Sequence, residues 1–493
     1  MKIFSAEQIR DWDKYTIENE PMPSIDLMEK AARACYNWLI GNYPTATFKI
    51  ICGKGNNGGD GLAIARRLLE KGHHASVYIL EADNQGSADF KLNYQRLKSY
   101  TSINYLRSIA DLQALNKEDV IIEALFGTGL NKPLTGLAEE VVSHINNSES
   151  TVISIDIPSG LFADNSSAEG VIIKAAYTLT FQEYKLAFMI AENEQYFGKV
   201  VILDIGLHQK YYEQTESKYE LAEASVIKNI YKPRKEFSHK GNYGHALLIA
   251  GSYGMMGAAI LAAKGCLRSG VGKLTCLVPE TGYEIMQIAV PEAMCIVSGK
   301  KHVKNIEGYK NYATIGIGPG LGRYDSHTEL LQSLFEHCKR PIVIDADGLN
   351  TIAKHDKLLH FIPENSIITP HLKEFDKLFG DSSNDFKRIE KAEQRAKNHN
   401  IYVVLKGHRT FITGPEGRSY FNSTGNAGMA TGGSGDVLTG VLTGLLAQGY
   451  SPLNTCLLGT YLHGLAGDIA AERYSQEAMT ASDIIKCLPD AFK

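Results

Sequence analysis

The sequence lacks the features that mark secreted, membrane-spanning and nucleic-acid-binding proteins. No stretch reaches about 18 apolar residues, the length needed for a spanning helix. The first segment, MKIFSAEQIRDWDKY, is polar and lacks the apolar core that a signal peptide has. The 51 Lys+Arg and 55 Asp+Glu leave a formal net charge of -4, which gives no reason to expect nucleic acid or a membrane as a partner. We therefore expect a cytoplasmic protein that acts on small molecules.

Cysteine is sparse, with eight residues in 493 and no CxxC pair. A disulfide framework is typical of small secreted chains, and a zinc site needs clustered ligands. The sequence meets neither condition, so we expect free thiols in a reducing compartment. By contrast, 44% of the residues are hydrophobic, which is enough for sizeable cores.

The chain is too long for one ordinary domain, and its pattern divides it into two α/β halves. In each half, short apolar runs that predict strands alternate with segments of helical periodicity, which favours parallel sheets covered on both faces. The polar, charged stretch 209–242 separates the halves. We therefore predict two three-layer α/β/α domains, 1–225 and 226–493.

Three loops of the first half follow predicted strands: GKGNNGGDGL, EALFGTGL and SIDIPSGL. Glycines permit close approach of the backbone to a ligand, and a following helix offers free N–H groups to an anion. Because strand carboxyl ends meet in one crevice of such a sheet, Asn57, Glu123, Gly127, Asp156 and Ser159 should lie together. Oxygen ligands from Asn57, Glu123 and Ser159 could hold a hard cation, and their low charge favours a monovalent one.

The second half contains NSTGNAGMATGGSGDVLTG, the most specific segment of the chain. Its glycines leave the backbone free to wrap an anion, and the helix that begins near Asp436 directs its dipole at the same point. Such donors stabilise charge on a transferred phosphoryl group. Asp436 is placed to accept a hydroxyl proton. Asp345 and Asp347 end a strand over the same cleft, either as structural hydrogen-bond acceptors or in contact with substrate or metal-bound water.

The motifs NNGGDGL, ALFGTGL and IDIPSGL, in this order, resemble the epimerase domain of the bifunctional NAD(P)H-hydrate repair enzymes. The resemblance implies a Rossmann-like domain that interconverts the R and S forms of hydrated NAD(P)H (NAD(P)HX). It makes Asp156 the candidate acid/base and Asn57, Glu123 and Ser159 potassium ligands. It also implies that the substrate is contacted by Asn56, Asn57, Gly58, Gly59, Asp60, Gly127, Thr128, Gly129, Leu130, Asn131, Lys132, Pro133 and Asp156.

The GGSGD element resembles the anion hole and catalytic Asp of the ribokinase-like superfamily. The upstream motifs GIGPGLG, VIDADGLN, TPHLKEF and VVLKGHRTFI resemble its dehydratase branch, which removes water from (6S)-NAD(P)HX with ADP and Mg²⁺. The resemblance implies that Ala258, Gly320, His371 and Asp436 contact the hydrate, with Asp436 as base, and that Glu374 orders a magnesium-bound water. The implied nucleotide contacts are Lys406, Gly407, His408, Arg409, Thr410, Asn426, Ala427, Gly428, Met429, Ala430, Thr431, Gly432, Gly433, Ser434 and Gly435.

Two other functions fit parts of the pattern. A ribokinase-like kinase for a small molecule would share GGSGD, with the first half as a binding module, but would release a phosphorylated product. A Rossmann-like scaffold or RNA binder would use the first half without chemistry. The expected partners are therefore NADHX, NADPHX and ADP, with no nucleic acid or membrane, and by analogy with the family the protein is expected to be a homo-oligomer.

Overall fold

The computed structural model describes residues 1–20, 22–81, 85–167 and 169–493. The chain forms two compact units. The N-terminal unit comprises Lys2–Lys218 with Asn384–Phe386, and the C-terminal unit comprises Met1, Tyr219–Ser383 and Lys387–Lys493. A search of the described residues finds no helix long and apolar enough to cross a membrane.

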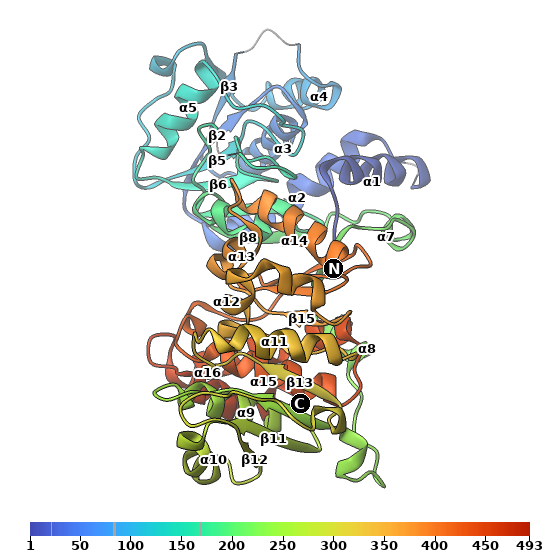
Figure 1. Ribbon diagram of the computed structural model, residues 1–493. Helices are drawn as coiled ribbons and strands as arrows, with labels where there is room; N and C mark the ends of the chain where they lie inside the picture. Colours follow the sequence, from blue (N-terminus) through green and yellow to red (C-terminus); the bar gives the residue numbers. More distant parts are fainter. Residues whose placement is uncertain (21, 82–84, 168) are drawn as a thin grey trace. The chain divides into compact units, whose positions relative to one another are not determined.

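The N-terminal unit alternates strands and helices along the chain (Figure 1). Its strands are β1 (Lys2–Ile3), β2 (Thr47–Cys52), β3 (Ala75–Leu80), β4 (Ile103–Leu106), β5 (Asp119–Ala124), β6 (Thr151–Ile155), β7 (Tyr177–Phe181) and β8 (Lys199–Leu203). Its helices are α1 (Ala6–Asn19), α2 (Ser24–Asn42), α3 (Asn56–Glu70), α4 (Ala88–Leu97), α5 (Leu137–Asn146), α6 (Glu194–Phe197) and α7 (Gln209–Gln214).

The sheet of this unit has the order β4-β3-β2-β5-β6-β7-β8, with every pair parallel. Helices α2, α3 and α4 pack on one face, where Leu39, Leu62 and Leu97 are buried. Helix α5 packs on the other face through Val141 and Ile145. The direction of strand addition reverses between β2 and β5, so the loops after these strands diverge and leave a crevice at their carboxyl ends.

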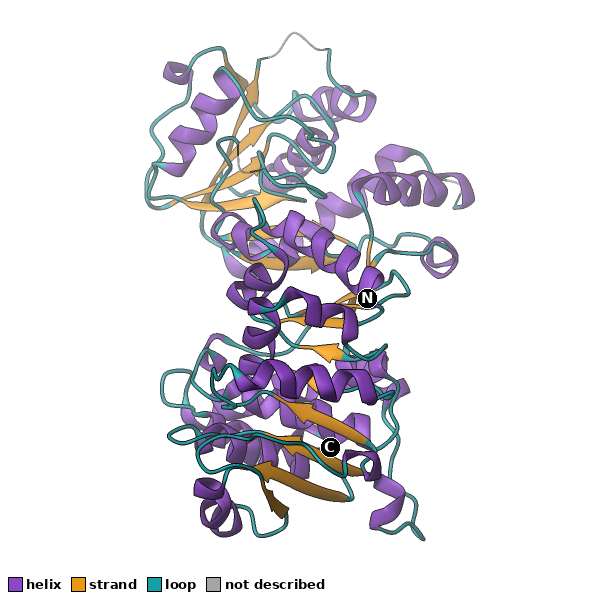
Figure 2. Ribbon diagram, viewed as in Figure 1, coloured by secondary structure: helices purple, strands orange, loops and turns teal. Residues whose placement is uncertain are grey.

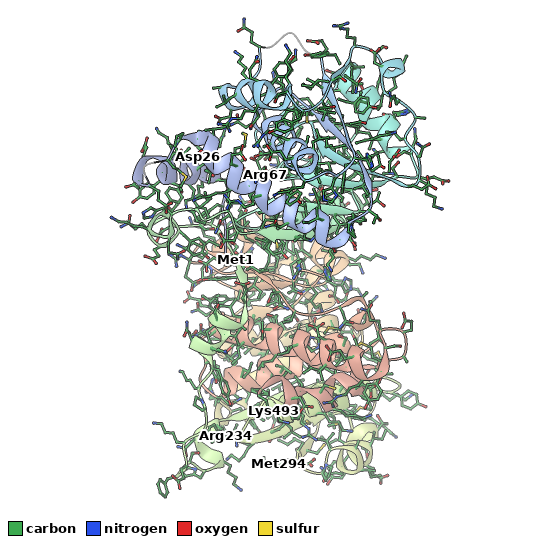
Figure 3. All side chains as sticks on the ribbon, turned by 180° about the vertical axis from the view of Figure 1, so that it is seen from behind. Met1, Asp26, Arg67, Arg234, Met294 and Lys493 are labelled. Atoms are coloured by element: carbon green, nitrogen blue, oxygen red, sulfur yellow. The ribbon has the colours of Figure 1, made fainter. Side chains whose placement is uncertain are left out.

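An ionic cluster ties α2 to α3 outside this core. Glu29 of α2 accepts from Arg67 of α3 at 2.6 Å and also pairs with Arg66 of α3. Figure 3 shows Asp26 and Arg67 on these two helices, which contact each other. The pairing fixes the helix whose first turn forms one side of the crevice.

The C-terminal unit contains a larger mixed sheet (Figure 2). Its strands are β9 (Tyr219–Ala222), β10 (His245–Ile249), β11 (Lys273–Val278), β12 (Met294–Val297), β13 (Thr314–Ile317), β14 (Val343–Ile344), β15 (Ile367–Ile368), β16 (Tyr402–Leu405), β17 (Phe411–Thr413) and β18 (Ser419–Asn422). Its helices are α8 (Ala224–Ile230), α9 (Met256–Arg268), α10 (Tyr283–Ala289), α11 (Ser326–His337), α12 (Ala346–Lys354), α13 (Leu372–Phe379), α14 (Asp385–His399, whose first residues belong to the N-terminal unit), α15 (Ser434–Ala447), α16 (Pro452–Tyr474) and α17 (Ala481–Ala491).

Within this unit the strands run in the order β9-β18-β17-β16-β15-β14-β13-β10-β11-β12, antiparallel only at β16-β17 and β17-β18. Helix α15 is the centre of one covering layer and packs against α9 and α16. It is buried along nearly its whole length, which agrees with its run of apolar and small residues. The direction of strand addition reverses between β10 and β13, which places a second crevice beside the first turn of α15.

The predicted fold class, α/β with sheets covered by helices, is confirmed. The division of the chain lies between Lys218 and Tyr219, not after residue 225. The reason is that β9 pairs in parallel with β18, more than 190 residues later, and so belongs to the second sheet. The 209–242 stretch is also not a plain connection, because it contains α7, β9 and α8. Charge and polarity indicated a boundary here but could not show this long-range pairing.

Candidate functional sites

The first site is built on the turn between β2 and α3. A side chain on Gly58 would place its Cβ 1.8 Å from the Gly53 carbonyl oxygen, and one on Gly53 would lie 2.0 Å from the Leu125 carbonyl oxygen. Both positions therefore require glycine, because the start of α3 packs against Gly53 within the turn and Gly53 packs against the loop after β5. This close approach brings the first turn of α3, with Asn56 and Asn57, to the mouth of the crevice.

A buried polar cluster lies behind this turn. Glu123, at the end of β5, is fully buried and accepts hydrogen bonds from the Leu125 amide and the Ser154 hydroxyl, both at 2.8 Å, and from the Ser159 hydroxyl. Burial raises the pKa of Glu123, while these donors oppose the rise. Asn57 is buried, yet neither its side-chain oxygen nor its nitrogen has a hydrogen-bond partner among the described residues. An unsatisfied buried amide is costly and indicates a missing ligand.

Asp156 follows β6 in a conformation that few non-glycine residues adopt, with φ of 68°. Its Oδ1 lies 2.8 Å from Nζ of Lys185, and its Oδ2 accepts from the Thr128 amide at 3.4 Å. Lys185 is completely buried and also donates to the Thr180 hydroxyl at 2.6 Å and the Phe181 carbonyl at 3.1 Å. The strained backbone and the buried cation together hold the Asp156 carboxylate at the crevice.

A cavity of about 400 Å³ opens in front of these groups. Among the predicted substrate contacts, the structure brings together Asn56, Asn57, Asp60, Gly127, Thr128, Gly129, Leu130 and Asp156 as lining residues. Gly58 and Gly59 face the protein instead, since a Cβ on Gly59 would meet the Met28 side chain at 2.9 Å. Asn131, Lys132 and Pro133 are exposed and do not line this cavity.

The second site lies in the C-terminal unit, around the first turn of α15. Gly433 caps this helix in the left-handed conformation, with φ of 91°. The Ser434 amide donates to the Thr431 carbonyl at 3.4 Å, and the Gly435 and Asp436 amides follow it in the first turn, where a helix offers no intrahelical acceptor. A Cβ on Gly435 would lie 3.4 Å from Nζ of Lys406 and 3.8 Å from Oδ2 of Asp345. The glycine turn therefore presents backbone donors beside a fixed ammonium group, which suits a phosphate.

Asp436 stands in the same first turn, and its pKa is raised to about 6. Burial is the largest cause, and the neighbouring carboxylates of Asp345, Asp347 and Glu374 add to it, whereas Lys406 opposes it. Asp345 is almost fully buried and is engaged by Lys406 Nζ at 2.8 Å and the Thr439 hydroxyl at 2.6 Å. Asp347 accepts from the Gly322 amide at 2.9 Å in the loop after β13.

The predicted hydrate contacts of this unit lie around the loops after β10, β13 and β15. A Cβ on Gly320, whose φ is 57°, would lie 3.0 Å from the Ala258 Cβ, so these two residues are neighbours. His371 caps α13, and its backbone amide donates to Glu374 at 3.0 Å. Glu374 is buried and lies 3.9 Å from Lys406 Nζ, whereas the His371 side chain is half exposed. The structure thus connects His371 to the Asp436 region through Glu374 and Lys406.

The glycine-rich loop before α15 is held by Asp468 of α16. Its two carboxylate oxygens accept from the Gly425 amide at 3.0 Å and the Asn426 side chain at 2.9 Å. Asn426 in turn accepts from the Gly428 amide at 3.0 Å. The other predicted nucleotide residues lie on this loop and the β16–β17 turn, where Arg409 donates to the Ser423 carbonyl at 3.0 Å and Thr410 to the Gly407 carbonyl at 3.0 Å.

Comparison with known proteins places both sites in one family. Residues 246–490 match the family model described as NAD(P)H-hydrate dehydratase, and residues 24–187 match the model described as YjeF-related protein N-terminus. The chain is 34% identical to the bifunctional NAD(P)H-hydrate repair enzyme Nnr of Moorella thermoacetica, over 99% of this chain and 96% of that protein. The chain belongs to the bifunctional NAD(P)H-hydrate repair enzyme family.

The corresponding repair enzyme of Escherichia coli is 29% identical over 99% of this chain and 93% of its own length. A crystal structure titled ADP/ATP-dependent NAD(P)H-hydrate dehydratase from Bacillus subtilis, co-crystallised with ATP/Mg²⁺, is 31% identical, with a TM-score of 0.49. It covers 55% of this chain and 97% of that one. The two family models and the full-length match to the Moorella thermoacetica enzyme confirm the family resemblance inferred from the sequence motifs.

Sequence reasoning missed three residues that organise the sites of this repair-family chain. Lys185 and Asp468 look like ordinary surface charges in QEYKLAF and GLAGDIA, and only the fold shows that one pairs with Asp156 and the other with the glycine-rich loop. Asp13, in α1, lines the first cavity together with Asp60 and Asp156. One feature of the sequence could have indicated Asp13: it is a charged residue at a position where the helical pattern predicts an apolar one.

Proposed function

We propose that this chain repairs hydrated NAD(P)H in two steps. The N-terminal unit interconverts the R and S epimers at C6, and the C-terminal unit dehydrates the S epimer with ADP as phosphate donor, giving NAD(P)H, AMP and phosphate. The observation that carries the proposal is the first turn of α15, where the Lys406 ammonium approaches Gly435 and burial raises the pKa of the neighbouring Asp436. Family membership over the full chain supports both activities.

In the dehydration, Asp436 takes the proton of the C6 hydroxyl as that oxygen attacks the terminal phosphorus of ADP. The amides after Gly433 and the Lys406 ammonium stabilise the negative charge on the transferring group. The ring nitrogen lone pair then expels phosphate by breaking the C6–O bond. Loss of a proton from C5 restores the dihydronicotinamide. The atoms balance, because the hydroxyl oxygen of the hydrate ends in the released phosphate and the hydroxyl and C5 hydrogens are released as protons.

The residues around Asp436 fit a hydrated magnesium ion. Burial and, after it, the negative charges of Asp345, Asp347 and Glu374 raise the pKa of Asp436, and a divalent cation would relieve the repulsion among these carboxyl groups. Glu374 is the residue that would order a metal-bound water. When bound, Mg²⁺ would neutralise charge on the phosphate oxygens of the nucleotide.

The pKa of Asp436 predicts how dehydration depends on pH. A base acts in its ionised form, so activity requires pH above the pKa, here about 6. We expect kcat/KM for (6S)-NADHX to be level above about pH 7 and to fall roughly tenfold per pH unit below about pH 6. The measurement is initial rate against pH at saturating ADP. A level profile down to pH 5 would contradict the assignment of the base.

In the epimerisation, the cavity of the N-terminal unit holds the hydrated ring near Asp156. The C6 hydroxyl takes up a proton and leaves as water while the ring nitrogen lone pair forms the C6=N1 bond. Water then adds to the other face of C6, and the Asp156 carboxylate, oriented by Lys185 and by the Thr128 amide, accepts the proton that this water releases. Asn56 and Asp60 line the same space and can bind polar groups of the substrate.

The buried cluster of this unit fits a monovalent cation. Asn57 has an unsatisfied oxygen, and Glu123 and Ser159 supply further oxygens from the adjoining strand ends. A site with one carboxylate and neutral oxygens suits K⁺, which would hold the β2, β5 and β6 loops in the geometry that binds substrate.

We expect epimerisation to depend on K⁺. Replacing 100 mM KCl by tetramethylammonium chloride should slow consumption of the R epimer by roughly tenfold or more, since the three loops lose their common ligand. Consumption of the S epimer should change little. The control variant Asn57→Ala should be slow in both salts. Equal R-epimer rates in both salts would remove potassium from the proposal.

The proposed function is tested by mixing the full chain with both epimers of NADHX, ADP and Mg²⁺, and following reduced-nicotinamide absorbance. We expect complete recovery of NADH with one AMP and one phosphate per turnover. A small-molecule kinase would instead accumulate a phosphorylated product and leave NADHX unchanged. Recovery of only the S epimer would show that the first unit is a binding module.

We also infer a cytoplasmic location, because all eight cysteines are free thiols, seven of them buried. The homo-oligomer stays a prediction from the family resemblance.

A further inference from the structure

Asp13 is an acidic residue on the inward face of the N-terminal helix α1. Its neighbours at helical spacing, Ile9 and Ile17, also line the cavity region, and the adjacent Trp12 and Thr16 are buried. A carboxyl group gains nothing from burial in an apolar core. Asp13 is a carboxyl group on the face of α1 that is otherwise directed inward. Its position therefore calls for a role in the cavity.

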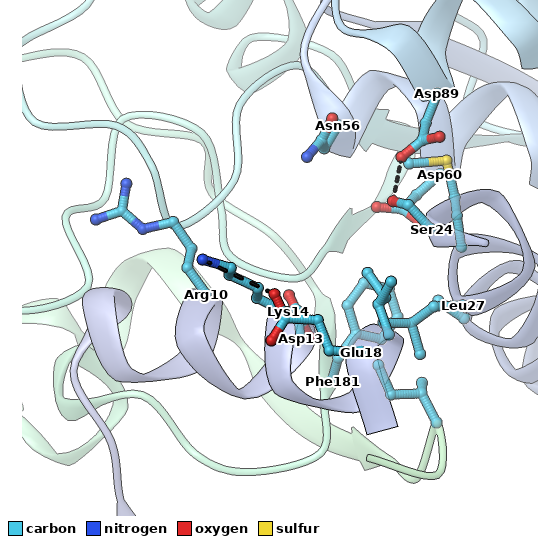
Figure 4. Close-up of a pocket in the computed structure, with 14 residues that line it drawn as sticks. Arg10, Asp13, Lys14, Glu18, Ser24, Leu27, Asn56, Asp60, Asp89 and Phe181 are labelled. Atoms are coloured by element: carbon cyan, nitrogen blue, oxygen red, sulfur yellow. Dashed lines mark hydrogen bonds and ion pairs between the residues drawn. The ribbon is translucent and has the colours of Figure 1, made fainter. Parts of the chain in front are cut away.

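The cavity continues from the β-strand ends along α1. A second region of about 420 Å³ shares Arg10, Asp13, Asn56 and Asp60 with the first. Figure 4 shows Arg10, Asp13, Lys14 and Glu18 on α1, with Asn56 and Asp60 on the other side of this space. Asp13 thus lines both regions, on a different element from Asp156, which ends β6 in the same cavity.

The two carboxyl groups have different environments. Burial raises the pKa of Asp13 to about 7, the nearby Asp156 raises it further, and Lys185 opposes both. Asp156 holds the ion pair with Lys185 at 2.8 Å. The other charged groups that line the space around Asp13 are Arg10, Lys14 and Glu18 of α1, Asp60 of α3 and Asp89 of α4. Asp13 can therefore hold a proton near neutral pH, whereas the Asp156 carboxyl faces an ammonium group, and two such different environments suit an acid and base pair.

We propose that Asp13 is a second catalytic acid/base residue of the epimerase site, acting with Asp156 on a substrate held between helix α1 and the end of β6. The inference rests on the epimerisation proposed above. It extends the site beyond the three strand-end loops to a helix that precedes them in the chain.

The step balances as a loss and return of water. Asp13 gives its proton to the C6 hydroxyl, the C6–O bond breaks, and the ring nitrogen lone pair forms the C6=N1 bond of an iminium ion. Water then adds to the other face of C6, its oxygen forms the new C–O bond, and its proton passes to Asp156. The reverse reaction uses the two carboxyl groups in exchanged roles, and proton exchange with solvent resets them.

The test uses the full chain with ADP, Mg²⁺, K⁺ and a mixture of both NADHX epimers. The absorbance trace has a fast phase, in which the S epimer is dehydrated, and a slow phase limited by conversion of R to S. We expect Asp13→Asn to slow the second phase by about 10²–10⁴ towards the rate without enzyme, the usual contribution of an acid/base group. The fast phase should be unchanged. Asp11→Asn, an exposed position of the same helix, is the matched control and should leave both phases unchanged.

The pH profile separates catalysis from a structural role. The wild-type kcat/KM for the slow phase should decline on the alkaline side, above about pH 7, and the residual activity of Asp13→Asn should lack this decline. Asn has the shape of the protonated Asp, so the thermal transition should not fall. If Asp13→Asn does not fold, Asp13→Glu must show the decline at a shifted pH, and an unshifted profile overturns the proposal.

Three results overturn the inference in distinct ways. A wild-type slow phase no faster than the uncatalysed interconversion refutes the epimerase function itself. A slow phase that runs at the wild-type rate in Asp13→Asn refutes the role of Asp13 alone. A slow phase that is reduced in Asp13→Asn but keeps the wild-type alkaline decline reduces Asp13 to a packing residue of α1.

Discussion

Replacing Asp436 by Asn is expected to lower kcat for dehydration of (6S)-NADHX by about 10²–10⁴, because the amide cannot accept the hydroxyl proton. The KM for ADP should change less, since the amides of the α15 turn and Lys406 are left in place. The measurement is NADH formation from the pure S epimer at saturating ADP and Mg²⁺. The same variant should still interconvert the epimers, which chromatography of NADHX detects without dehydration.

Asp381→Asn is a matched control, because Asp381 is an exposed aspartate of the same unit, outside the site. It should dehydrate at the wild-type rate. The Asn variant at 436 also removes a carboxyl that burial and three like-charged neighbours make costly to ionise, so its thermal transition at pH 8 should be no lower than wild type. Retention of wild-type kcat by Asp436→Asn would show that another group is the base.

Replacing Asp156 by Asn is expected to abolish acceleration of R-epimer consumption, a loss of about 10²–10⁴, while S-epimer dehydration continues. Asn is the informative substitution because residue 156 has φ of 68°, a conformation that Asn tolerates better than most residues. It keeps the shape of the side chain and removes its charge. The two phases of NADH recovery give both rates from a single reaction.

The variant leaves Lys185 without its carboxylate, although the bonds to Thr180 and the Phe181 carbonyl persist. A thermal melt monitors the cost of that buried charge. If the N-terminal unit melts early, Lys185→Met combined with Asp156→Asn removes the unpaired charge and should still lack the slow phase. Wild-type R-epimer consumption by folded Asp156→Asn would contradict the assignment of the acid/base.

Much of the fold followed from local pattern. Short apolar runs between helical segments predicted both sheets, and the reversals of strand order lie where the glycine-rich loops are. Elements with weak local signals were missed. Strand β4 is a half-buried edge strand of four residues, and β9 is recognisable only through its parallel partner β18. A pairing between residues so distant in sequence has no local signature, which is why the predicted division was late.

The sequence by itself determined the chemistry at the strand ends. Asn57, Asp156 and Asp436 lie in or beside glycine-containing turns of recognisable sequence, and their roles were predicted from these turns, because a turn against an anion or a helix start limits which residues fit. The tertiary structure alone decided which distant charges serve them. Lys185 pairs with Asp156, Lys406 with Asp345, and Asp468 with the Gly425 loop. Asp13 reaches the cavity only because α1 packs beside it. Charge pairing depends on distance in space, and burial sets its strength, so neither is readable until the chain is folded.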